Sequence, residues 1–181
     1  MLKVTDETIL KKISINDQKD LYNLMSRIYP STCEHLWIDK GKWYIDNLYS
    51  YDNPRKELSE SNSLYFFIQY QSNIVGILRI LENEPLIDFK KEKAAKLQRI
   101  YLAPSAQGKG IGKALINWTE NKQRELGYSI LWLEVMDTQT KAIRFYEKLG
   151  FKISGKLSLE SDLVYKNLTG HVSHVEMAWK R

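Results

Sequence analysis

The sequence predicts a single α/β domain built on a mixed β-sheet with helices packed against it. Three observations support this prediction. Short apolar runs rich in β-branched and aromatic residues alternate with helical apolar spacings over the second half of the chain. A length of 181 residues suits one hydrophobic core, and the chain contains no internal repeat. We therefore expect residues 1–181 to fold as one domain.

The first elements expected are a short strand and a helix. Residues 8–13 have the apolar, β-branched character of a strand, and Asn16 or Asp17 can cap the helix that follows. Tyr29 and Pro30 are expected to end this helix, because proline has no backbone N–H to donate.

A hairpin is expected after a segment that allows no firm assignment. Residues 31–62 are rich in aromatic and acidic side chains, with a mixed helical spacing that Asn53 and Pro54 interrupt. Residues 64–70 and 74–81 then form two β-rich runs joined by a short polar turn, which is typical of a β-hairpin.

The second half of the chain predicts alternating strands and helices. Residues 96–102 predict a strand that follows a charged loop at 82–95. Alternation along this strand places on one face Leu97, Arg99 and Tyr101, and on the other Gln98, Ile100 and Leu102. The remaining elements are a helix at 110–126 ended by Gly127, a buried strand at 130–136, a helix at 139–149 ended by Gly150, and strands at 151–159 and 172–179.

Composition and charge argue against several classes of protein. The 27 basic and 22 acidic side chains give a net charge of +5, and the basic excess lies in residues 97–181. This excess would attract an anionic ligand, although it serves solubility equally well. Because the Lys and Arg residues are scattered singly, no nucleic acid partner is expected. One cysteine, Cys33, and three histidines allow no intrachain disulfide and no Cys-rich zinc site, so no metal is expected.

The chain also lacks the signals of a membrane or secreted protein. Its longest strongly apolar run, residues 64–68, is far shorter than the ~20 residues that a membrane helix needs. Residues 1–10 are interrupted by Lys3, Asp6 and Glu7, so they lack a secretory core. We expect no membrane partner and a cytoplasmic location.

A glycine-rich loop joins the strand at 96–102 to the helix at 110–126. Gly108, Gly110 and Gly112 allow a tight turn and a close approach of the backbone to a ligand. The first N–H groups of the helix lack partners within the helix, and its dipole adds positive potential, so this turn predicts an anion cradle. Lys109 and Lys113 add full charges, which favours a pyrophosphate. A loop bent only for packing is the alternative.

Spacing excludes two common phosphate loops here. A Walker loop needs a glycine five residues before its Gly-Lys pair and a Ser or Thr after it, but Gln107 and Ala114 occupy these positions. A dinucleotide fingerprint fails because Lys113 and Leu115 stand where its third glycine belongs.

Two motifs carry a resemblance to a known family. Gln107-Gly-Lys-Gly-Ile-Gly112 resembles the Q/R-x-x-G-x-G/A loop of the GNAT acetyltransferase superfamily, and Ala142-Ile-Arg-Phe-Tyr-Glu-Lys-Leu-Gly-Phe151 resembles its A-x-x-x-Y-x-x-x-G-F segment. The resemblance implies the GNAT fold, a mixed central β-sheet splayed between two parallel strands with helices on both faces. It also implies acetyl-CoA as co-substrate.

The resemblance assigns cofactor contacts position by position. Strand residues Ile100, Tyr101 and Leu102 would meet the pantetheine arm of acetyl-CoA. Backbone groups of the loop would bind its phosphates, through Gln107, Gly108, Lys109, Gly110, Ile111, Gly112 and Lys113. Gln139 stands where relatives often have an asparagine that contacts pantetheine. Lys148 would reach the 3′-phosphate, unless it is simply an exposed helix lysine.

Tyr146 and Glu134 are the implied catalytic residues. Tyr146 matches the family tyrosine that protonates the sulfur of coenzyme A, with a core tyrosine as the alternative. Glu134 lies in an apolar strand, where burial would raise the pKa of an unpaired carboxylate and so favour its acceptance of a proton. It is expected to act as the base through a water, because Gln98 replaces a glutamate found in many relatives. A carboxylate paired with a cation such as Arg99 is the alternative.

The expected acceptor is a primary amine. Aromatic and acidic residues at 29–52, together with residues 159–174, would suit a small amine or a polyamine, unless the aromatics form a core and the acids face water. The chain is loosely similar to bacterial spermidine/spermine acetyltransferases. Acetyl transfer to N-terminal peptides and a non-catalytic acyl-CoA-binding module remain alternatives. A homodimer stays open, and Cys33 lies outside both motifs, so no acetyl-cysteine step is expected.

Overall fold

The computed structural model describes residues 1–89, 91–159 and 172–180 of the chain. Within these residues, the strands form one sheet in the order β1-β2-β3-β4-β5-β6-β8-β7. The strands are β1 (Leu2–Lys3), β2 (Thr8–Lys12), β3 (Ser63–Tyr70), β4 (Asn73–Leu81), β5 (Ala94–Leu102), β6 (Ile130–Met136), β7 (Lys152–Leu159) and β8 (Val172–Lys180). Apart from the additional strand β1, these are the strands that the sequence predicts.

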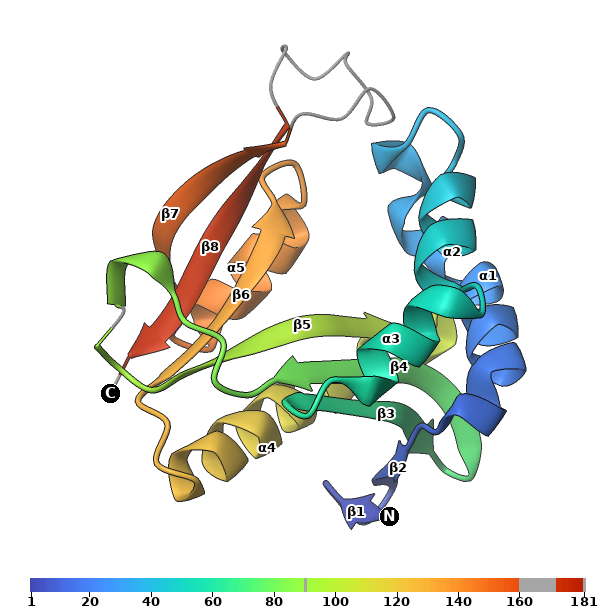
Figure 1. The fold of residues 1–181 in the computed structure, drawn as a ribbon, viewed down its shortest axis with the longest axis horizontal. Helices are drawn as coiled ribbons and strands as arrows, with labels where there is room; N and C mark the ends of the chain where they lie inside the picture. The colour runs from blue at the N-terminus through green and yellow to red at the C-terminus, as the bar shows by residue number, and fades with distance from the viewer. Residues whose placement is uncertain (90, 160–171, 181) are drawn as a thin grey trace.

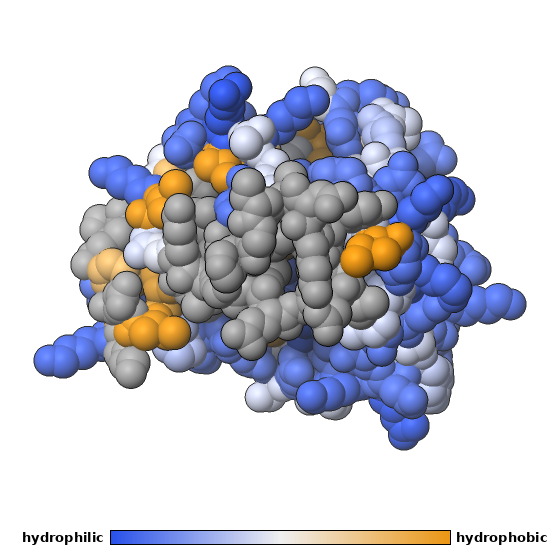
Figure 2. All heavy atoms as spheres, turned by 90° about the horizontal axis from the view of Figure 1, so that it is seen from above, coloured by the Kyte–Doolittle hydropathy of each residue, from blue (hydrophilic) through white to orange (hydrophobic). Residues whose placement is uncertain are grey.

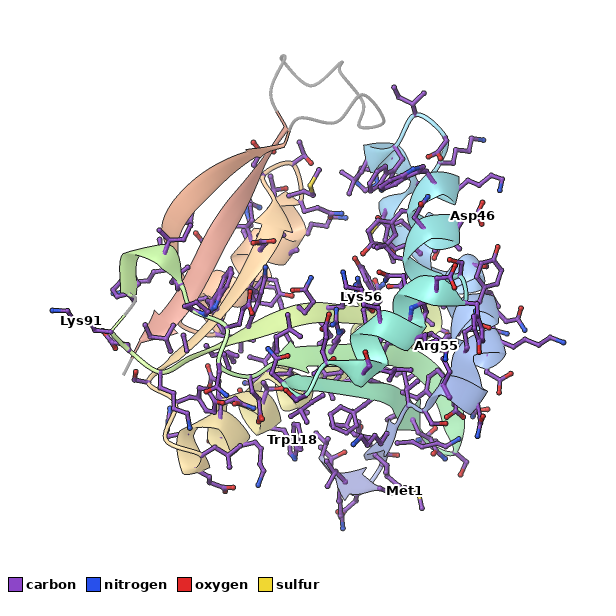
Figure 3. The ribbon with its side chains drawn as sticks, viewed as in Figure 1. Met1, Asp46, Arg55, Lys56, Lys91 and Trp118 are labelled. Atoms are coloured by element: carbon purple, nitrogen blue, oxygen red, sulfur yellow. The ribbon has the colours of Figure 1, made fainter. Side chains whose placement is uncertain are left out.

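Helices cover both faces of this sheet (Figure 1). The helices are α1 (Gln18–Cys33), α2 (Lys42–Tyr49), α3 (Asp52–Ser59), α4 (Ile111–Glu125) and α5 (Thr140–Lys148). One buried cluster joins α1 and α2 to one face of β3 and β4, and another joins α4 and α5 to the opposite face of the sheet. Figure 3 places Lys56 of α3 and Trp118 of α4 on opposite sides of the sheet.

The sheet opens between its two parallel strands. β5 and β6 pair in parallel only from Ala94 to Lys96 against Ile130 to Trp132. Beyond these pairs the two strands diverge, and β6 continues in antiparallel pairing with β8 (Figure 1). The predicted splay between two parallel strands is therefore confirmed.

A β-bulge corrects the predicted faces of β5. Arg79 of β4 pairs with Arg99, but the next residue of β4 pairs with Leu97, so Gln98 is an extra residue in the ladder. Leu97 consequently packs in the cluster beneath α4, whereas Arg99 contacts Glu57 of α3 on the opposite face. The prediction that Leu97 and Arg99 share a face is wrong, because alternation of side chains resets at the bulge.

Two prolines lie inside helices rather than at breaks. α1 continues through Pro30 to Cys33, so the predicted end at Pro30 is wrong. Burial of Tyr29 and Cys33 on the core face of α1 offsets the hydrogen bond that proline removes. The segment 31–62 folds mainly into α2 and α3, with Pro54 in the first turn of α3, where an N–H would have no partner within the helix.

In the coloured part of Figure 2, most side chains are hydrophilic and a few hydrophobic ones lie among them. No helix in the described part of the chain combines the length and the hydrophobicity needed to cross a membrane. In the same residues, no group of three or more His, Cys, Asp or Glu side chains is arranged to hold a metal ion.

Candidate active site

The glycine-rich loop forms a left-handed turn into α4. Gly108 and Gly110 have φ angles of 75° and 77°, in the region that residues with a Cβ rarely adopt. A Cβ at either position would meet no atom within 4 Å, so the backbone conformation, not crowding, is what requires glycine. The N–H of Ala114 donates to the Gly110 carbonyl, which leaves the N–H groups of residues 111–113 without acceptors inside α4.

Side chains around this turn hold it against the sheet. The Gln107 amide donates to the Leu102 carbonyl at 3.1 Å and so ties the loop to the end of β5. Ile111 is buried and anchors the first turn of α4 in the core. A Cβ on Gly112 would lie 3.4 Å from the ring of Phe145, so α4 approaches α5 closely at this residue.

The cradle fits the diphosphate of a coenzyme A thioester. Free N–H groups point from the start of a 15-residue helix, and the loop lies directly after β5, where the sheet opens. Lys113 is exposed, and the Lys109 ammonium lies 5.3 Å from the centre of the Tyr70 ring beside the loop. Residues 107–113 would therefore hold the phosphates, while the open edge of β5 at Ile100 and Leu102 would face the pantetheine arm.

Tyr146 lies on the α4 and α5 side of the sheet. Its side chain is 8% exposed and packs in the cluster that contains Leu131 and Leu133 of β6. Its ring contacts Phe145 and Phe151 edge to face, with centroids 5.2 and 5.7 Å away. Burial raises the pKa of Tyr146 well above its usual value, so the hydroxyl keeps its proton at neutral pH and can donate it.

Glu134 lies on the other face of β6, where it forms an ion pair. Its Oε1 atom is 2.8 Å from the ammonium of Lys96, and its side chain is 24% exposed. The Lys96 ammonium also lies 4.3 Å from the centre of the Trp132 ring. The expectation of an unpaired carboxylate in an apolar strand is therefore wrong, and the pairing partner is Lys96 instead of Arg99.

Gln139 and Lys148 lie at opposite ends of α5. The Gln139 amide at the start of α5 lies 3.9 Å from the Cys33 sulfur at the end of α1, so it links the two halves of the molecule. Burial raises the pKa of the Cys33 thiol, which favours the protonated, unreactive form. Lys148 is exposed in the last turn of α5.

An aromatic cluster lies between α1, α2 and the end of β5. Tyr29 and Tyr44 stack with their ring centroids 4.3 Å apart, and the Tyr44 and Tyr101 hydroxyls are 3.0 Å apart. The acids of this segment have local partners: Asp39 accepts from the backbone at the start of α2, and Asp46 pairs with Lys42. Tyr29 and Tyr49 are buried in the core, whereas Trp43 and Tyr51 are exposed, so the alternative of an aromatic core holds for part of this segment. Residues 160–171 of the expected acceptor region lie outside the described residues.

A buried ionic network lies beside this cluster, and sequence reasoning missed it. Glu57 of α3 accepts two hydrogen bonds from Arg99, each 2.7 Å long, and its Oε1 atom is 2.9 Å from Arg79. Arg79 also pairs with Glu60 at 2.5 Å. No local pattern signals this network, because its members come from α3, β4 and β5 and meet only in the folded chain.

The structure thus combines a mixed sheet that opens between two parallel strands with a glycine-rich turn at the start of α4. A model of the Acetyltransferase (GNAT) family matches residues 19–151. The chain belongs to this family, and the resemblance stated from its two motifs is confirmed.

Curated relatives are N-acetyltransferases by name. An uncharacterized N-acetyltransferase from the pepI 3′ region of Lactobacillus delbrueckii subsp. lactis is 27% identical over 107 residues, which are 59% of this chain and 62% of the relative. The uncharacterized N-acetyltransferase YjgM of Escherichia coli (strain K12) is 27% identical over 145 residues, or 80% of this chain and 81% of the relative. The chain thus spans about three fifths of the first relative and four fifths of the second.

Solved structures share the fold over nearly the whole chain. The PaiA N-acetyltransferase from Thermoplasma acidophilum, solved in complex with coenzyme A, has a TM-score of 0.70 and 21% identity, with 96% of this chain and 99% of that chain covered. A mutant of the spermidine N-acetyltransferase SpeG from Vibrio cholerae has a TM-score of 0.66 and 21% identity, with 97% and 95% covered. At this identity, the likeness shows the fold alone.

Proposed function

We propose that this protein is an N-acetyltransferase that transfers the acetyl group of acetyl-CoA directly to a small primary amine. One observation carries the proposal: Tyr146 packs against one face of β6 in the cluster that includes Ile111 of α4, and Glu134 lies on the other face, two residues beyond the last parallel pair of β5 and β6. A thioester drawn between the diverging strands from the α4 side would meet a proton donor on one face. An amine arriving from the α3 side would meet a proton acceptor on the other.

Each residue has a defined part in this reaction. The N–H groups of residues 111–113, with Lys109 and Lys113, bind the phosphates and so fix the carrier along β5. Glu134 accepts, through a water, the proton that the ammonium form of the amine must lose before its nitrogen can attack the acetyl carbon, and the nitrogen gives its second proton to solvent as the amide forms. Tyr146 gives its proton to the sulfur as the carbon–sulfur bond breaks. Acetyl-CoA supplies the activated acetyl group, and all electrons stay paired.

The acceptor class is supported by the relatives. Structures of the same fold include spermidine N-acetyltransferases, and the streptothricin acetyltransferase of Streptomyces lavendulae is 39% identical over 59 residues. These names favour an amine acceptor. A cytoplasmic location belongs to the same proposal, since one free cysteine suits a reducing compartment.

Replacement of Tyr146 by Phe tests the proposal. Tyr146→Phe removes the proton donor but keeps the ring in its buried site, so amine-dependent release of free thiol should fall about 10²-fold or more. Calorimetric affinity for coenzyme A should change less than about threefold. Free-thiol production over a panel of amines measures the first quantity.

Two outcomes would contradict the proposal. Absence of thiol release by the unmodified protein with every amine, despite tight coenzyme A binding, would identify an acyl-CoA-binding module instead. Equal rates for the unmodified protein and Tyr146→Phe would remove the assigned role of the hydroxyl.

A further inference from the structure

Lys96 is a buried cation at the point where the sheet opens. It pairs in register with Trp132, the last parallel pair before β5 and β6 diverge. The whole residue is 9% exposed, its ammonium lies 2.8 Å from Glu134, and the ring of Trp132 lies 4.3 Å beneath it. An ion pair and a cation–π contact therefore fix this ammonium beside the proposed base.

The other strong charges described on this face of β4 and β5 also carry counter-charges. Arg79 and Arg99 pair with Glu57, and Arg79 also pairs with Glu60. The network holds two cations and two carboxylates, and the Lys96–Glu134 pair holds one of each. An arriving acceptor therefore meets a carboxylate whose charge a fixed internal cation already balances.

We infer that Lys96 is a specificity-determining residue whose ammonium, fixed beside Glu134, repels a second ammonium group of the acceptor. The inference rests on the proposed function and narrows it: acceptors with a single amino group are favoured over diamines and polyamines. The reacting nitrogen must lose its proton and is neutral when it attacks, so Lys96 does not repel it. A second ammonium group keeps its charge and meets Lys96 in a partly buried, weakly screened site.

Two acceptors of equal length isolate this second charge. Butylamine and putrescine share a four-carbon chain and differ by one terminal amino group, so the ratio of their kcat/KM values reports the effect of that group. The unmodified protein should favour butylamine. Lys96→Met keeps an apolar stem against Trp132 while removing the charge, and should move the ratio toward putrescine by about tenfold.

The chain offers a matched control for this substitution. The ammonium of Lys93 lies 4.1 Å from the centre of the Tyr128 ring, in the loop before β5 and outside the opened part of the sheet. Lys93→Met therefore removes a similar stacked cation and should leave the ratio within about twofold. Lys96→Arg keeps the charge and should also leave the ratio of kcat/KM values within about twofold of that of the unmodified protein. Lys96→Gln provides a second neutral variant, and thermal melting checks that each variant is folded.

The outcomes separate this inference from the proposed function. A putrescine preference in the unmodified protein, or an equal ratio in Lys96→Met, Lys96→Gln and the unmodified protein, would overturn the inference while leaving acetyl transfer intact. A loss of rate with both amines and no change in ratio would give Lys96 a merely structural role. Absence of turnover with any amine would overturn the proposed function, and the inference with it.

Discussion

Gly110 and Gly112 lie two residues apart in the cradle but are glycine for different reasons. Gly110 has a φ of 77°, whereas Gly112 lies inside α4 and has no positive φ. A methyl group added to Gly112 would lie 3.4 Å from the ring of Phe145, which is an ordinary contact distance. A left-handed conformation costs a residue with a Cβ about 1–2 kcal/mol. The first position therefore controls the shape of the anion site, and the second controls only the packing of α4 against α5.

This difference gives a paired prediction. Gly110→Ala should weaken coenzyme A binding about tenfold, because the loop relaxes from the turn that aims its N–H groups at the phosphates. Gly112→Ala should change affinity by less than about threefold and keep the helix stable. Calorimetric titration of coenzyme A into both variants measures the effect. An equal loss in the two variants would show that crowding, not conformation, governs the loop.

Single residues also mark the limits of sequence reasoning. The motifs indicated Tyr146 and the loop because their spacing is local; in the structure Tyr146 packs in the cluster that contains Leu131 and Leu133 of β6, and the loop follows β5. Lys96 carries no such signal, since its partner Glu134 lies 38 positions away and the two meet only when the parallel strands pair. The catalytic roles of Tyr146 and Glu134 stay predictions.

At the scale of elements, α3 is held to the sheet by charge as well as by apolar contact. Glu57 is 6% exposed and holds Arg79 and Arg99 together across β4 and β5. Removal of one partner from a buried ionic network leaves uncompensated charge in the interior, which typically costs about 3–5 kcal/mol. This makes Glu57 a structural residue on the face where the acceptor is proposed to arrive.

Charge neutralisation at Glu57 should therefore destabilise the fold. Glu57→Gln should lower the free energy of unfolding by about 3 kcal/mol, measured by urea denaturation. Glu60→Gln is the matched control, because its side chain is 35% exposed, and it should lose less than about 1 kcal/mol. Similar losses in the two variants would mean that the network contributes through exposed pairs only.

Element boundaries were predictable where local patterns decide them. The hairpin of β3 and β4 and the helices α4 and α5 follow the predicted ranges closely, and Gly127 and Gly150 have the expected positive φ. The end of α1 and the faces of β5 were not predictable. Tertiary burial carries α1 past Pro30, and the bulge at Gln98 depends on pairing with β4.

Over the whole molecule, buried tyrosines couple folding to alkaline pH. Burial raises the pKa of Tyr65 to about 12 and also raises the pKa values of Tyr29, Tyr49, Tyr101 and Tyr146 above the ordinary value near 10. These tyrosines bind protons more tightly in the folded state than in the unfolded state. Their contribution to stability is therefore fully present below about pH 10 and is lost as pH rises toward 12.

Thermal melting between pH 8 and pH 11.5 tests this expectation. The melting temperature should stay nearly constant up to about pH 9.5 and then fall steeply, as unfolding exposes phenols that ionise at their ordinary pKa. Ultraviolet absorbance of tyrosinate, recorded in parallel, should rise together with unfolding for the buried fraction. A constant melting temperature up to pH 11.5 would contradict the coupling.

The narrow join between β5 and β6 has a consequence for how the molecule is held together. Three residue pairs connect the two strands, and from Leu97 onward the inner edge of β5 turns toward the opening instead of toward β6. A sheet normally exposes such an edge at its rim, whereas here it lies in the middle. An extended ligand lying along this edge of β5 would pair with it as a neighbouring strand does. Binding of the ligand in each catalytic cycle would therefore complete the hydrogen-bonding ladder of the sheet, and its release would interrupt the ladder again.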